Sequence, residues 1–417
     1  MRFTGIVLFV TAIAFTAFAA PEKSAENKTA KTQKSAPAKK NPAKKNQPKK
    51  RTPPPASVDI STLAPNGGDV TRAMLQAIKS RTPKIIFSKP GVYQLRPVTL
   101  FRPVQIILND GVTIKAMPQA SASKGQKVAK LPGLFTGDRV RGIQITGKGN
   151  ALIVGDKLPI FAFRSSNNIS ISKLAVSDGE AAVDAYNCWG FRLTDVVFDN
   201  FSVSAAMING GGWNGLTNLQ FRNIKGRALT IVADSNGRVP NMTLENCEFF
   251  NNNDSVKVLA PAKFTIKPVD LKKNPKYRPP RLNFRSCRFF NNTGIDLEIY
   301  GALDDGFVRV ENSVFTTPDN TAIKFTEFTT GNGLKAEIIR TAIHPEPENR
   351  NIPVEVTVTQ DKPFGNITFT KTTVKQPVHK KAIKYNLKKN QGNIAGKLQV
   401  VSNDGNVKNA ELVMEGK

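Results

Sequence analysis

"NISISKLAVSD" at 168–178 and "GFRLTDVVFDN" at 190–200 begin a pattern that recurs as "GLTNLQFRN" at 215–223, "NMTLENCEFFNN" at 241–252 and "RLNFRSCRFFNN" at 281–292. Apolar and polar residues alternate in each segment, which is the period of a β-strand. One apolar position can be followed through eight segments, at Val176, Phe198, Phe221, Phe249, Phe289, Phe315, Ile343 and Val374. The steps between these positions are 22, 23, 28, 40, 26, 28 and 31 residues, which predicts a solenoid whose coils stack in register.

A polar residue that favours tight turns follows five of these positions by two residues, at Asp178, Asn200, Asn223, Asn251 and Asn291. Such residues tolerate turn backbone angles, and an asparagine amide can bond to its equivalent on the next coil. Stacked apolar residues beside stacked turns predict an all-β fold, a single-stranded right-handed parallel β-helix. A β-sandwich has strands of the same period, but it gives no reason for this register.

Upstream of the repeat, the sequence predicts a short helix that caps the open end of the solenoid. Asp69 is the expected N-cap, and apolar residues recur at helical spacing from Val70 to Ile78. Two strand-like pieces follow, "KIIFS" at 84–88 and "VTLFRPVQIIL" at 98–108.

The first residues predict export. Arg2 precedes an apolar run from Ile6 to Phe18, and Ala17-Phe18-Ala19 fits a signal-peptidase site, so residues 1–19 are predicted to be a signal peptide, with an uncleaved anchor as the alternative. Residues 20–56 form a basic linker rich in Lys, Pro and Ala that is predicted to be disordered. Such a linker is either a tether to anionic cell-surface polymer or a solvated spacer. The β-helix is predicted over 57–417, with β-rich C-terminal coils.

The net charge favours polyanionic partners. The chain carries +28 in total, and residues 22–51 contribute eleven basic against two acidic side chains. Without these and Arg2, about +18 remains on the rest of the chain, so the solenoid is itself basic. Acidic polysaccharide, nucleic acid and an anionic membrane surface all fit this charge. Export and the lack of a nucleic-acid-binding motif count against nucleic acid, and no later stretch is apolar enough to cross a bilayer.

Two further features of the repeat have open interpretations. The 40-residue step contains an insertion at 260–280 with five Lys and one Arg, either a groove wall for a polyanion or a neutral decoration. Cys247 and Cys287 occupy equivalent positions on successive coils, where they either pack as small apolar residues or form a disulfide. Cys188 would be the remaining thiol.

The segment "GGDVTRAMLQAIKSRTPKIIFSKPGVYQLRPVTLFRPVQIILNDGVTIKA" at 67–116 resembles the entry of the pectin-lyase-like superfamily. In that group a capping helix precedes P-G-x-Y and a strand that ends in G-x-x-I, here Pro90–Tyr93 and Gly111–Ile114. The resemblance covers about Asp59 to Val374 and implies the β-helix fold. It does not choose among hydrolases, lyases, epimerases and proteins that only bind.

The polygalacturonase-like hydrolases in this superfamily have an Asp pair after an N-C-x-x strand and Gly-His-Gly one coil later. Here Asn253-Asp254 stand at the pair, no histidine follows on the next coil, and Lys225 and Arg227 stand near the place of a further carboxylate. Inverting hydrolysis needs two carboxyl groups that flank the bond. The sequence therefore disfavours this mechanism.

Elimination by a lyase needs a basic residue to remove a proton and a cation to neutralise the uronate carboxylate. Lys257 is the predicted base and Arg227 the predicted carboxylate clamp, with Asp254 beside them. Asp254, Asp296 and Glu298 are the candidate ligands for Ca²⁺. The same polar residues also fit the exposed face of an ordinary strand.

The predicted substrate contacts are Trp189 and Trp213, together with Lys225 and Asp184. The two tryptophans are expected at equivalent positions at the starts of successive coils, where sugar rings could stack on their faces. Corner packing is the alternative for both tryptophans. Asp304-Asp305 in "LDDGF" form either an acidic pair or a turn between coils.

The sequence predicts a secreted or periplasmic carbohydrate-active protein that binds acidic polysaccharide or an anionic cell-envelope polymer and cleaves it by β-elimination if it is an enzyme. The alternative is a non-catalytic scaffold that binds glycan or the cell envelope. We expect a monomer.

Overall fold

The computed structural model divides the chain into two units, Met1–Thr52 and Pro53–Lys417. The structure describes residues 55–117, 133–233, 239–260, 281–301, 307–317, 320–326, 334–345, 351–357, 365–375, 383–386, 392–401 and 407–415. The predicted signal peptide, the linker up to residue 54, the insertion at 261–280 and Asp304-Asp305 lie outside these residues.

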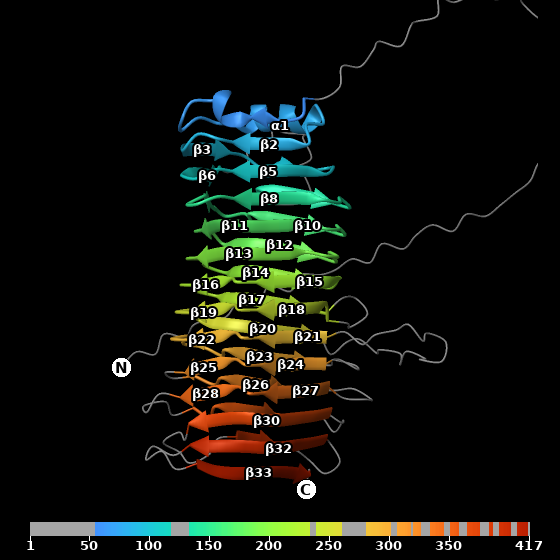
Figure 1. The fold of residues 1–417 in the computed structure, drawn as a ribbon, viewed down its shortest axis with the longest axis vertical. Coiled ribbons are helices and arrows are strands. Elements are labelled where there is room, and N and C mark those ends of the chain that lie inside the picture. The colour runs from blue at the N-terminus through green and yellow to red at the C-terminus, as the bar shows by residue number, and fades with distance from the viewer. Residues whose placement is uncertain are drawn as a thin grey trace, which may run out of the picture. The chain divides into compact units, whose positions relative to one another are not determined.

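Successive strands of the second unit stack side by side as flat coils from the N-terminal to the C-terminal end (Figure 1). One wall is an eleven-stranded sheet to which each coil adds one parallel strand. Its strands are β4 (Val98–Thr99), β7 (Phe135–Asp138), β10 (Phe161–Arg164), β12 (Ala181–Tyr186), β14 (Ser204–Asn209), β17 (Arg227–Val232), β20 (Asp254–Ala260), β23 (Leu297–Gly301), β26 (Ile323–Thr326), β29 (Val354–Thr357) and β31 (Ile383–Asn386).

The remaining walls belong to a 22-stranded sheet, in which most coils place two strand segments. Its strands are β1 (Val58–Asp59), β2 (Lys84–Phe87), β3 (Gly91–Leu95), β5 (Val104–Leu108), β6 (Val112–Ala116), β8 (Ile143–Gly147), β9 (Leu152–Val154), β11 (Ser170–Ser177), β13 (Arg192–Asp199), β15 (Gly212–Thr217), β16 (Gln220–Arg222), β18 (Asn241–Glu245), β19 (Glu248–Phe250), β21 (Arg281–Arg285), β22 (Arg288–Phe290), β24 (Phe307–Glu311), β25 (Val314–Thr317), β27 (Leu334–Ile339), β28 (Ala342–Pro345), β30 (Gly365–Lys375), β32 (Gly392–Val401) and β33 (Val407–Glu415). All pair in parallel except the last two, β32 and β33, which are antiparallel. These coils confirm the predicted parallel β-helix.

The predicted apolar ladder is confirmed at every step. Each of its eight residues is paired in register with the next, from Val176 with Phe198 through to Ile343 with Val374. All eight are buried, and the rings of Phe221 and Phe249 stack with their centroids 4.8 Å apart. This spacing is the distance between neighbouring strands, so the stack follows directly from the register.

The five predicted turn residues all have positive φ angles, between 54° and 59°. Their side-chain bonds differ from the expected amide ladder. Asn200 donates to Asp178 over 2.6 Å, whereas Asn223 donates to Asp199, the residue before its equivalent, over 2.7 Å. A charged oxygen is the stronger acceptor, which accounts for both choices.

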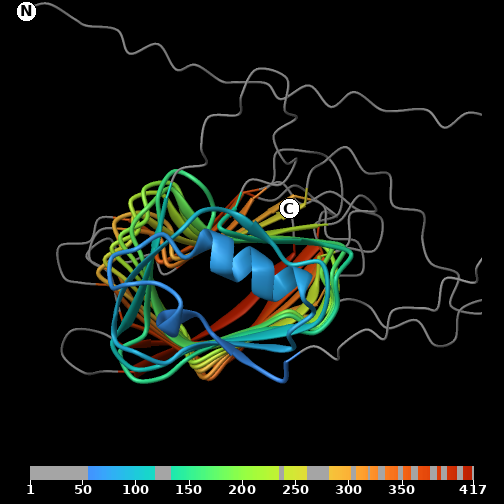
Figure 2. The ribbon, with the colours of Figure 1, turned by 90° about the horizontal axis from the view of Figure 1, so that it is seen from above.

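The capping helix α1 (Thr71–Lys79) lies across the open end of the coils (Figure 2). It begins later than predicted, because Val70 is the N-cap, while the Asp69 carboxylate accepts the Thr71 N–H over 2.9 Å. Met74, Ala77 and Ile78 are buried beneath it. The second predicted strand piece is divided into β4 and β5, because "LFRP" makes a corner and Arg102 donates to the Ile78 carbonyl at the helix end over 2.9 Å.

Candidate functional site

The predicted base lies on the outer face of the eleven-stranded sheet. Because side chains alternate across a strand, Val256 and Val258 of β20 point into the core and Lys257 points outward. Lys257 Nζ lies 2.9 Å from an oxygen of Glu298 on the next coil and 5.0 Å from the ring centroid of Tyr300. The two charged side chains are only 20 % and 14 % exposed. Lys257 is therefore engaged by a carboxylate and an aromatic face rather than left available to a substrate proton.

This pair is one step in a column of alternating charge. The register places Lys257, Glu298, Lys324 and Glu355 beside one another on four successive coils. Lys324 and Glu355 form a second ion pair at 3.4 Å. These four charged residues are therefore explained by ion pairs that hold neighbouring strands together.

The predicted clamp, Arg227, is paired in the same way. Its Nη2 lies 2.9 Å from Oδ2 of Asp254, its partner in register on the next coil, while Oδ1 of Asp254 accepts the Ile295 N–H. The structure thus brings Arg227 and Asp254 together as an ion pair between neighbouring coils. Lys225 lies exposed in the turn just before Arg227.

The three candidate calcium ligands do not meet. Asp296 is fully buried and accepts a hydrogen bond from Asn292 over 2.8 Å, whereas Glu298 points outward to Lys257. Burial raises the pKa of Asp296 well above the ordinary aspartate range. Within the described residues, no group of three or more His, Cys, Asp or Glu could hold a metal ion. The described residues therefore do not assemble the predicted Ca²⁺ site.

Asp184 faces outward in the same column as Lys257 but three coils earlier, since Met207 and Thr230 separate them in register. Desolvation raises its pKa, and Arg164 partly opposes that change. Three coil steps of about 4.8 Å separate Asp184 from Lys257, so the two side chains cannot act on one sugar unit.

Both tryptophans lie exposed where the chain passes from the eleven-stranded sheet into the 22-stranded sheet, on successive coils; we call this place the tryptophan corner. Trp189 is 49 % and Trp213 is 70 % exposed. Trp189 pairs with Gly212, not with Trp213, so the predicted equivalence is off by one residue. The register between these two coils is regular, since Arg192 pairs with Gly215 at the same offset as Trp189 with Gly212. A bulge in the pairing with the next coil lies between Gly212 and Asn214, where Trp213 takes a φ of 56°.

The thiols do not form a nucleophilic site. Cys188, Cys247 and Cys287 are all free and buried in the structure. Burial is the main reason that the pKa of Cys188 rises to about 11, and it raises the pKa of Cys247 well above the ordinary range. A thiol that stays protonated is a poor nucleophile.

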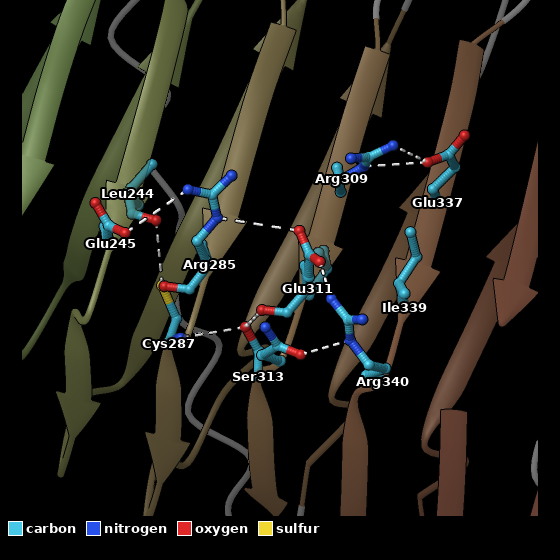
Figure 3. Close-up of polar contacts among 12 residues, drawn as sticks. Leu244, Glu245, Arg285, Cys287, Arg309, Glu311, Ser313, Glu337, Ile339 and Arg340 are labelled. Atoms are coloured by element: carbon cyan, nitrogen blue, oxygen red, sulfur yellow. Dashed lines mark hydrogen bonds and ion pairs between the residues drawn. The ribbon is translucent and has the colours of Figure 1, made fainter. Parts of the chain in front are cut away.

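A second charged column, which the sequence reasoning missed, runs along the 22-stranded sheet (Figure 3). Arg285 lies between Glu245 and Glu311 on the coils either side, at 3.7 Å and 4.0 Å, and Arg340 also pairs with Glu311. Beside this column, Arg309 and Glu337 form another ion pair between neighbouring coils, with 2.6 Å between Nη2 and Oε2. The sequence did contain a signal for this column, because residues of opposite charge recur at the spacing of one coil. The surface of these coils is therefore cross-linked by ion pairs.

Comparison with known proteins supports the fold and leaves the activity open. No family model matches the chain, and no curated protein matches it in sequence. Among the described residues, no helix has the length and apolar character to cross a bilayer.

Solved structures match over most of the chain. The surface protein and adhesin PfbA of Streptococcus pneumoniae is 13 % identical, with 83 % of this chain and 97 % of that chain covered and a TM-score of 0.53. The A-module of the mannuronan C-5 epimerase AlgE6 of Azotobacter vinelandii is also 13 % identical, with 83 % and 96 % covered and a TM-score of 0.55. An exopolygalacturonase of Thermotoga maritima is 12 % identical, with 87 % and 94 % covered and a TM-score of 0.48. The two matches with TM-scores above 0.5 and the stacked parallel coils show that the chain has the right-handed parallel β-helix fold that the sequence predicted.

Proposed function

We propose that this chain is an exported β-helix protein that binds acidic polysaccharide on its outer surface without cleaving it. The observation that carries the proposal is the tryptophan corner. The only two tryptophans of the chain lie exposed on successive coils, 49 % and 70 %, in a protein whose other large side chains mostly fill the core. Exposed indole rings are costly unless they have a partner, and sugar faces are suitable partners.

The charge of the chain indicates that the polysaccharide is acidic. The total is +28, so a polyanion would be attracted over the whole chain and not only at one contact. The adhesin and the epimerase with the same fold have names that refer to surface attachment and to mannuronan. They are consistent with a glycan partner here.

The residues best suited to elimination argue for binding over cleavage. A general base must lie within hydrogen-bond reach of the proton that it removes. Lys257 instead lies 2.9 Å from Glu298, and Arg227 lies 2.9 Å from Asp254. Each cation that a lyase would use is thus committed to a carboxylate of the next coil.

The test is affinity gel electrophoresis of residues 53–417, the second unit, through gels that contain pectate, alginate or a glycosaminoglycan. Migration should be retarded by at least one acidic polymer and not by a neutral glucan. The variant Trp189→Ala/Trp213→Ala should migrate at the same rate with and without polymer.

Catalysis is measured in the same samples from the ultraviolet absorbance of unsaturated uronate ends and from new reducing ends. Both should stay at the level of a protein-free control, with and without Ca²⁺. A rise in absorbance that Lys257→Ala abolishes would show a lyase and refute the binding-only proposal. New reducing ends without absorbance would show a hydrolase.

A further inference from the structure

A groove of about 520 Å³ lies beside Trp213 on the outer face of the 22-stranded sheet. Residues from β13, β15, β18 and β21 line it, so it spans four successive coils. It lies on a different sheet from Lys257, Arg227 and Glu298.

The floor of the groove is open because of one glycine. Gly215 is paired in register with Arg192 on the coil before and Thr243 on the coil after, so these three positions form one outward column. A Cβ built on Gly215 would meet no atom within 4 Å. The missing side chain therefore leaves a space between Arg192 and Thr243.

One end of the groove is aromatic. Trp213 lines it and is 70 % exposed, which leaves most of the indole surface available for contact. Trp213 lies at the bulge that follows Gly212 and faces outward between the inward-facing Gly212 and Asn214, and its positive φ is a strained conformation for a bulky residue. Backbone strain of this kind is found at ligand sites more often than elsewhere.

The groove is also positively charged. Arg192 and Arg281 line it, and the lining residues include no acidic side chain. In the part of the chain that the structure describes, no carboxylate pairs with either arginine, in contrast to Arg285, Arg309 and Arg340 on the same sheet. The guanidinium of Arg281 lies 5.8 Å from the ring centroid of Phe307. That contact restrains the side chain and leaves its N–H groups to a ligand.

Amide groups complete the lining. Asn214 is only 4 % exposed, and its Oδ1 accepts the Phe191 N–H over 3.0 Å. Its Nδ2 has no hydrogen-bond partner among the described residues, which is costly for a buried donor. Asn241 and Asn283 also line the groove. A ligand oxygen in the groove could accept from the partly exposed amides of Asn241 and Asn283.

We infer that this groove binds one anionic sugar unit. The inference rests on the proposed function and names the part of the polysaccharide that is recognised. The sugar ring lies against Trp213 above Gly215, its anionic group accepts from Arg192 and Arg281, and its hydroxyl oxygens accept from the amides of Asn241 and Asn283. Arginine matches planar carboxylates with two parallel hydrogen bonds, which favours a uronate over a sulfated sugar.

The test uses Trp189→Phe, in which Trp213 is the only tryptophan and therefore reports directly on the groove. The emission of this variant is titrated with an oligogalacturonate, its methyl-esterified form and a sulfated heparin fragment. The oligogalacturonate should change the emission saturably, the heparin fragment more weakly, and the methyl ester about tenfold or more weakly, because it lacks the charge.

Two added substitutions locate the binding. Gly215→Leu should abolish it by filling a space that no other atom occupies, so the fold should be retained, which circular dichroism checks. Arg192→Ala should weaken it by at least about tenfold. Arg285→Ala removes an exposed arginine of the same sheet that lies outside the groove and should leave the affinity unchanged.

The outcomes separate the two proposals. If acidic polymers retard the protein in gels but the Trp213 emission and Gly215→Leu show no effect, the groove is refuted and polysaccharide binding stands. If no acidic polymer retards the protein, the proposed function fails, and the groove fails with it unless the short oligogalacturonate still changes the emission. An equal response to the methyl ester would refute the anionic specificity.

Discussion

Asp296 is the residue whose charge fits its surroundings least. It is fully buried at the start of a strand, and its Oδ1 accepts from Asn292. Burial is the main cause of the raised pKa. In the unfolded chain the carboxyl ionises near the ordinary value of 3.8, whereas in the folded chain it holds its proton to higher pH. The folded state therefore loses stability as the pH rises from about 3.8 toward the raised value.

Asp296→Asn should remove this loss. The amide keeps the shape of the protonated carboxyl and can still accept from Asn292. We expect the variant to have a higher Tm than the wild type at neutral pH, with the difference shrinking to nothing below the ordinary aspartate pKa. Melting curves at several pH values check this. A difference that stays constant with pH would show that Asp296 does not titrate between the two states.

At the residue scale, the sequence predicted the inward-facing positions and failed on pairing partners. Val176 and the seven residues of its ladder were found because identical apolar positions must meet when coils stack. Asp296 was placed with Glu298 because strand alternation puts residues two apart on one face. Asp296 instead lies in the turn before β23, where it is buried, whereas Glu298 faces outward. Trp213 was misplaced by one position, although the 23-residue step from Phe198 to Phe221 puts Gly212 opposite Trp189.

At the scale of strands, the phenylalanine stack stabilises the central coils. Phe249 and Phe250 are neighbours on β19, and each stacks on its equivalent in β22, at 4.8 Å and 5.1 Å. Phe249 is fully buried inside the coil, while Phe250 lies on the outer face and is half-buried. The two residues thus make the same contact in different surroundings.

Phe249→Ala should lower the free energy of unfolding by about 3–5 kcal/mol, because it leaves a cavity between two rings. Phe250→Ala is the matched control and should cost about 1 kcal/mol, since water can fill its place. Urea unfolding followed by circular dichroism measures both. Equal losses would mean that stacking, rather than burial, provides the stability.

The Lys257–Glu298 pair can be tested as a link between β20 and β23. Lys257→Ala alone should lower the free energy of unfolding by about 1–3 kcal/mol, because it leaves a mostly buried carboxylate without its partner. Adding Glu298→Ala should recover part of that loss. A double-mutant cycle from urea unfolding measures the coupling, and a coupling near zero would argue that Lys257 is kept for another purpose.

At the scale of the whole molecule, the fold was predictable because the same pattern recurs along most of the chain, so local errors did not change the result. The capping helix was predicted from its apolar spacing, and its start was missed by one residue because the Asp69 carboxylate caps from one position outside. The groove beside Trp213 was not predictable. It depends on an absent side chain at Gly215 lying between two coils, and only the register reveals that.

The net charge predicts how binding depends on salt. Retardation by an acidic polymer should decrease steadily as the ionic strength rises, because screening weakens the attraction between opposite charges. The protein that comprises residues 20–417, with the basic linker, should bind the polymer more tightly than residues 53–417 at low salt. At high salt the two proteins should bind equally. Affinity electrophoresis over a salt series measures both. Retardation that is independent of salt would exclude an electrostatic contribution.

The parallel stacking of the coils also determines how the molecule would respond to force. Backbone hydrogen bonds join each coil only to its neighbours and run along the direction of stacking. A pull that separates the first coil from the last would load these bonds one coil at a time, as in unzipping. With a step of 22 or 23 residues between the early coils, each release would free about 80 Å of chain. If the protein is bound to a polymer and pulled along the stacking direction, it would unfold one coil at a time at low force. It would not unfold in one step as a whole domain.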